Sequence, residues 1–127
     1  MGIAAAMVAG LSAPAQALLA PQYYEQARNE AASVIVIAVR AVTPPDAGFG
    51  SCRVAGRVQA VERGATYAVG QDVSLAVPCR KAGAQPPVGG TIYQDVDALR
   101  ATPFGRAYLD AQGALALSQY EQLKTWP

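Results

Sequence analysis

The stretch Cys52–Cys79, CRVAGRVQAVERGATYAVGQDVSLAVPC, begins and ends on the only two cysteines of the chain. Apolar and polar residues alternate on both sides of a turn signal near Gly64. A period of two is typical of β-strands that bury one face. The stretch therefore predicts an antiparallel hairpin in which Cys52 lies directly opposite Cys79, and Val54 opposite Val77.

The two cysteines are predicted to form a structural disulfide. Directly opposed residues of an antiparallel pair have Cα atoms roughly 4.5–5.5 Å apart, which suits a disulfide. Cys52 and Cys79 do not form the CxxC motif of redox proteins. A labile redox pair and two free thiols are the alternatives.

The polar face of the same hairpin carries a candidate ligand surface. Arg53 and Arg57 share this face, and Arg80 and Lys81 follow its end. The four residues are the possible ligand face for an anionic polymer. The alternative is a solvated strand face, because Asp72 and uncharged polar residues dilute the charge.

The composition excludes several classes of function. The chain has 127 residues, with 52% hydrophobic and 15% charged residues and a formal net charge of +1. This length predicts one domain, and the charge gives no reason to expect a nucleic-acid partner. Histidine is absent, so Ser-His-Asp catalysis cannot operate and a zinc site lacks ligands. We therefore expect a protein that is not an enzyme and has no metal or cofactor.

Residues 1–17 have the pattern of a secretory signal peptide. The segment is uncharged and rich in alanine, and it ends in the small-x-small sequence Ala15-Gln16-Ala17. Cleavage there would leave a single disulfide-stapled β-barrel domain at 18–127, without a membrane span, in the periplasm or outside a bacterial cell. A retained membrane anchor is the alternative.

The remaining chain predicts a mainly β fold. A helix is expected over 21–32, a central strand buried on both sides over 33–42, and a strand over 91–96 followed by a turn or short helix capped by Asp97. A second hairpin should turn near 111–113. Together these elements predict a small closed or partly open antiparallel barrel of five to six strands with one N-terminal helix.

The segment NEAASVIVIAVRAV (29–42), followed by the hairpin with VERG and VGQDVSL, resembles the oligonucleotide/oligosaccharide-binding (OB) barrel of netrin-like and TIMP-like modules. The resemblance covers residues 28–79 and implies an OB-like barrel. The chain also resembles small exported proteobacterial proteins that have no assigned role. TIMP-like inhibition uses a cysteine at the mature N-terminus, whereas the mature chain here would begin LLAPQ. No functional residue is therefore carried over.

Three functions follow as expectations. The first is an exported, non-enzymatic binding module of the bacterial envelope, whose partner is a protein or an anionic surface polymer. The second is an envelope hydrolase that acts on glycans through carboxylates alone, with Asp95 and Asp97 as acid and base. The third is a structural subunit that pairs through the segment GALALSQY (113–120).

Overall fold

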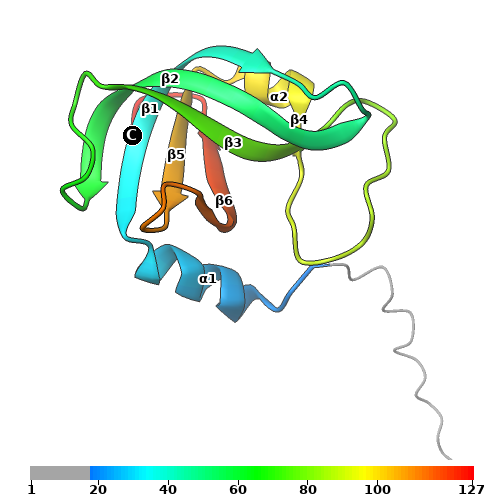
Figure 1. Ribbon diagram of the computed structural model, residues 1–127, viewed down its shortest axis with the longest axis horizontal. Coiled ribbons are helices and arrows are strands. Elements are labelled where there is room, and N and C mark those ends of the chain that lie inside the picture. The colour runs from blue at the N-terminus through cyan, green and yellow to red at the C-terminus, as the bar shows by residue number, and fades with distance from the viewer. Residues whose placement is uncertain (1–17) are drawn as a thin grey trace, which may run out of the picture.

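The computed structural model describes residues 18–127, so the expected signal peptide lies outside the described residues. The fold is mainly β: a six-stranded mixed sheet curls into a half-barrel (Figure 1). The elements are α1 (Pro21–Glu30), β1 (Ser33–Thr43), β2 (Phe49–Arg63), β3 (Asp72–Arg80), β4 (Gln94–Asp95), α2 (Val96–Ala101), β5 (Phe104–Leu109) and β6 (Leu115–Leu123). This confirms the expected partly open barrel with a helix before its first strand, and α2 adds a second helix.

The strand order is β4-β3-β2-β1-β5-β6. Neighbouring strands are antiparallel except for β3 and β4, which are parallel. The central position of β1 confirms the sequence prediction, since Ser33–Ile37 is buried without interruption. A β-branched run of this kind suits a strand with both faces covered.

Strand β2 is long and pairs on both of its edges, with β1 and with β3. Its pairing with β3 corrects the predicted register by two residues: Cys52 lies opposite Val77, and Cys79 lies opposite Gly50. At the turn end of this pairing, the N–H of Val58 donates to Gln71 O and its C=O accepts from Gly70 N, so that Gly70 and Gln71 together oppose Val58. A shift of two preserves the faces, so the predicted apolar face remains on the inside.

A disulfide joins Cys52 and Cys79, which are diagonal neighbours with Cα atoms 5.7 Å apart. This separation lies within the usual range for a disulfide. Both cysteines are fully buried and belong to the main core cluster. The disulfide therefore ties the two strands inside the half-barrel.

Helix α1 lies beneath the half-barrel and packs mainly on β6 (Figure 1). Pro21 begins the helix, where its missing N–H costs nothing. Tyr24 is the buried residue of the helix, and its hydroxyl donates a 2.6 Å hydrogen bond to Gly90 O. The helix ends at Glu30, two residues earlier than predicted. No helix in the described part of the chain is long and apolar enough to cross a membrane.

The predicted strand at 91–96 is mostly wrong. Only Gln94–Asp95 forms a strand, because it pairs with just the last two residues of β3. The predicted cap is also wrong: Asp95 is the residue that precedes α2, and it makes no capping hydrogen bond through its side chain. Asp97 lies within the first turn of α2.

The second hairpin, β5–β6, confirms the prediction for the C-terminal segment. Asp110 Oδ1 accepts hydrogen bonds from Gln112 N at 2.9 Å and Ala114 N at 3.0 Å, and these bonds form the turn. Beyond β6, the ring of Trp126 lies edge-on to Phe104 with centroids 5.6 Å apart. The end of the chain therefore returns to the start of β5.

We expect the variant that carries both Cys52→Ala and Cys79→Ala to unfold more easily. The disulfide spans a sequence separation of 27, and closing such a loop stabilises a protein by about 3–4 kcal/mol on the chain-entropy model. Urea unfolding of the oxidised native chain and of the double variant measures the loss. Equal free energies of unfolding would contradict a stabilising role for the disulfide.

Tyr120 gives the fold a specific alkaline sensitivity. Its side chain packs against Gly105, and burial raises the pKa of Tyr120 to about 12. The unfolded phenol ionises near pH 10, so the stabilisation is complete below pH 10 and is lost as the pH rises through 12. The loss amounts to about 2–3 kcal/mol. The free energy of unfolding, measured with urea, should fall more steeply between pH 10 and 12 for the native chain than for Tyr120→Phe. Parallel pH profiles of the two proteins would contradict this.

Candidate functional site

The outer face of β2 and β3 carries three of the four basic residues that the sequence singled out. Inward and outward residues alternate along both strands, and Arg53, Arg57 and Arg80 are exposed. Arg53 lies opposite Ala76, and Arg57 opposite Asp72. The alternation that buries the apolar residues therefore places these arginines on one surface, which we call the arginine face.

Carboxylates neutralise part of the arginine face. Asp72 Oδ1 lies 3.4 Å from Arg57 Nε and 3.7 Å from Arg40 Nη1. Asp95 Oδ1 lies 3.0 Å from Arg80 Nε. These pairs are largely exposed, and exposed pairs contribute little to stability. They orient Arg57 and Arg80 and reduce the positive charge available to a ligand.

Lys81 lies at the far end of the arginine face. Its Nζ donates to Asp46 O at 3.1 Å, and its backbone N–H donates to Gly48 O at 2.7 Å. Both contacts fix the β3 end against the loop that precedes β2. Lys81 is therefore tied to the backbone of a neighbouring loop.

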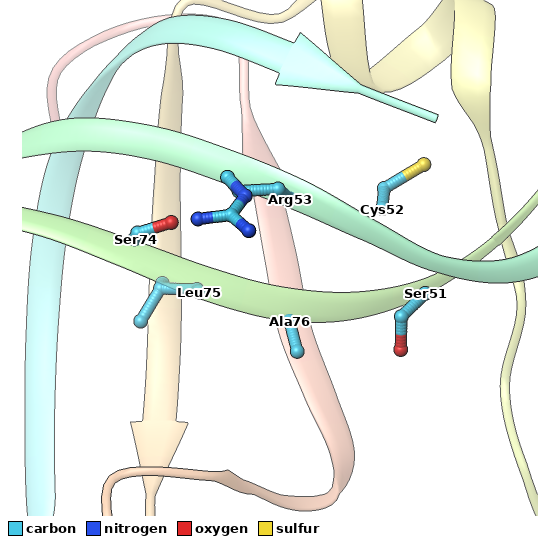
Figure 2. A pocket seen from close by; sticks show the side chains of 6 residues that line it. All are labelled: Ser51, Cys52, Arg53, Ser74, Leu75 and Ala76. Carbon is cyan, nitrogen blue, oxygen red and sulfur yellow. The ribbon is translucent and has the colours of Figure 1, made fainter. Parts of the chain in front are cut away.

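Arg53 forms no ion pair with any residue in 18–127. It lines a shallow hollow of about 320 Å³ together with the small residues Ser51, Ser74 and Ala76. Figure 2 shows the guanidinium turned toward Ser74, with Ser51 and Ala76 farther along the strands. The hollow therefore combines an uncommitted guanidinium with two hydroxyl groups.

Two aromatic rings border the Arg80 end of the face. Phe49 lies opposite Arg80 in the β2–β3 ladder, and its ring meets Tyr93 edge-on at a centroid distance of 5.8 Å. Sequence patterning did not find this pair, because Tyr93 was expected in a strand over 91–96 and lies instead in the loop that precedes β4. The pair adds an apolar border to a polar surface.

The carboxylates proposed for a hydrolase lie beside Arg80. Asp95 and Asp97 both line a hollow of about 380 Å³ with it. The Asp95 side chain is 61% exposed and is held by Arg80. Among the residues that the structure describes, no three side chains of His, Cys, Asp or Glu are grouped as a metal site requires.

Arginines outside the arginine face connect the elements of the fold. Arg106 is only 18% exposed and contacts Glu62 Oε1 at 2.7 Å and Glu121 Oε1 at 2.9 Å. The hydrogen bonds that Arg106 donates to these two carboxylates raise its pKa above the usual value. Arg106 therefore links β2, β5 and β6 as a permanent cation. Sequence patterning did not find this cluster, because its members are far apart in the chain.

No protein-family model, curated protein or solved structure shows significant similarity to this chain. Its disulfide is compatible with an extracellular or periplasmic protein, where thiols oxidise.

Arg63, which lies near the hairpin turn, should act in stability rather than in binding. Its Nη1 donates to Arg28 O at 2.8 Å and to Ala31 O at 3.0 Å, which satisfies carbonyl groups at the end of α1. We expect Arg63→Gln to lower the free energy of unfolding by about 1 kcal/mol. Urea unfolding measures this, with the exposed Arg100→Gln in α2 as the matched control; equal losses in both variants would contradict the capping role.

Proposed function

We propose that the protein is an exported, non-enzymatic binding module of the bacterial envelope, and that its arginine face holds an anionic surface polymer. Export rests on the signal-like sequence of residues 1–17 and on the disulfide. The site rests on the chemistry of the outer surface of β2 and β3. The proposal includes an OB-like barrel as the scaffold, as the resemblance over residues 28–79 implies.

The observation that carries the proposal is that Arg53 forms no ion pair with any residue in 18–127. A guanidinium presents five donors in a planar fork, which matches carboxylate, sulfate and phosphate oxygens. Arg57 and Arg80 already contact carboxylates, whereas Arg53 pairs with no carboxylate in residues 18–127 and its guanidinium is turned toward Ser74 (Figure 2). An anionic group in this hollow would receive charge-assisted hydrogen bonds from Arg53 and a neutral one from Ser74.

The shape of the face favours an extended polymer over a compact substrate. The hollow at Arg53 is shallow, and the neighbouring arginines continue along the strands rather than around a deep cavity. A polymer can contact several such positions at once, and weak contacts at each then add along its length. The carboxylate pairs at Arg57 and Arg80 would compete with the polymer, so moderate affinity that weakens with salt is expected.

Binding to dextran sulfate, with uncharged dextran as its matched probe, tests the proposal. The full chain should bind the sulfated polymer and not the neutral one. Arg53→Gln should weaken binding about tenfold, since one charge-assisted hydrogen bond contributes about 1.5 kcal/mol. Arg100→Gln removes the same charge from α2 and should have a much smaller effect.

Two results would contradict the proposal. Equal loss of binding in Arg53→Gln and Arg100→Gln would show that only net charge matters. Release of new reducing ends from an envelope glycan, abolished by Asp95→Asn, would instead support the hydrolase.

A further inference from the structure

A second concave site lies on another part of the molecule, between α1 and the β5–β6 hairpin. Figure 1 shows the turn end of this hairpin pointing toward α1. A cleft of about 540 Å³ lies there, a size typical of sites for small molecules. Its lining includes Arg28, Gln94, Tyr108, Gln119 and Glu121, and it shares no lining residue with the hollow at Arg53.

The wall of this cleft contains an irregular segment of β6. In β6, residues 116–119 form a bulge opposite the single residue Tyr108 of β5. Leu117 and Ser118 within it have φ angles of 50° and 63°, in the left-handed region that non-glycine residues rarely adopt. Strained residues of this kind concentrate at functional sites.

The bulge turns Gln119 inward and fixes its amide. Gln119 is only 7% exposed, and its Nε2 donates to Leu117 O at 3.0 Å. Its Oε1 accepts a 2.6 Å hydrogen bond from Arg28 Nη1. The amide therefore holds the guanidinium of Arg28 at the cleft.

Arg28 has charge to offer a ligand. It is partly buried, and no carboxylate in residues 18–127 pairs with it. Its contact with Gln119 uses one of the five guanidinium donors. An anionic oxygen in the cleft would supply the missing counter-charge, and a carboxylate matches the guanidinium fork.

The other walls offer the amide of Gln94, the carboxylate of Glu121 and the phenol of Tyr108. Gln94 Nε2 donates to Tyr120 O at 3.0 Å, and Gln94 Oε1 accepts from Gln122 Nε2 at 2.6 Å. Glu121 Oε1 is held by Arg106, which leaves its second oxygen as an acceptor. Tyr108 adds an aromatic ring with a polar tip. The cleft thus combines one cation with acceptors, donors and an aromatic surface.

We propose that this cleft binds a sugar that carries a carboxylate, of the uronic acid class. The carboxylate would bond to Arg28, the ring hydroxyls to groups such as Glu121 and Gln119, and the apolar face of the sugar would lie on Tyr108. A neutral sugar leaves Arg28 without a counter-charge, and a simple carboxylic acid leaves the acceptors unused. The proposal concerns a different surface from the arginine face and does not depend on it.

Ligand-observed NMR titration of the full chain tests the proposal with sodium glucuronate, and with glucose as the matched probe that lacks the carboxylate. Glucuronate should bind at least tenfold more tightly than glucose. Arg28→Gln should remove that preference, and Arg28→Lys, which keeps the charge but loses the fork, should retain part of it. Arg100→Gln should bind glucuronate as the native chain does.

The proposal is overturned by equal affinity for glucuronate and glucose, by unchanged glucuronate binding to a folded Arg28→Gln, or by absence of binding to the native chain. Acetyl-dialanine, which carries a carboxylate on a peptide, serves as the competing probe. Tighter binding of this peptide than of glucuronate would assign the cleft to peptide C-termini and would also overturn it. Circular dichroism of each variant establishes that it is folded, and Arg28→Lys carries the test if Arg28→Gln does not fold.

Discussion

The rest of the structure depends on the double pairing of β2, which hydrogen-bonds to β1 along one edge and to β3 along the other. Its inward residues, among them Val54 and Val58, are fully buried, so the strand joins the two sides of the half-barrel through one core. The disulfide from Cys52 to Cys79 ties this strand to β3 within the same core. Fixing β2 also fixes its outer residues, and the arginine face therefore follows from the burial of the opposite face.

The alternation in the sequence predicted which residues of this hairpin face inward, because burial acts on every second residue. It did not predict the register, since a shift of two residues leaves both faces unchanged. Only the turn distinguishes the two registers, and there Gly70 and Gln71 together oppose Val58. The prediction of a strand at 91–96 was wrong for a related reason. The length of this strand depends on where β3 ends, and local composition does not show where that is.

For the basic residues too, local sequence predicted some features, whereas others depend on contacts between residues that are far apart in the chain. Strand periodicity was enough to place Arg53 and Arg57 together. It could not show that Asp72 would form ion pairs with Arg57 and Arg40, or that Asp95, from another strand, would form one with Arg80. Arg28 and Gln119 were missed for the same reason, since they are 91 residues apart and meet only because α1 packs on β6. Charge in the sequence therefore identifies candidate ligand groups, whereas the fold decides which of them remain uncommitted.

The bulge in β6 affects both the pairing capacity of this edge strand and the strain in its backbone. It interrupts the row of backbone groups that an edge strand offers to another strand, which makes GALALSQY a poorer pairing surface than its sequence indicates. It also costs about 1–3 kcal/mol for each strained residue, and glycine would adopt the same conformation at less cost. The contacts of Gln119 with Leu117 and Arg28 offset part of this cost. The same contacts place the guanidinium of Arg28 at the cleft.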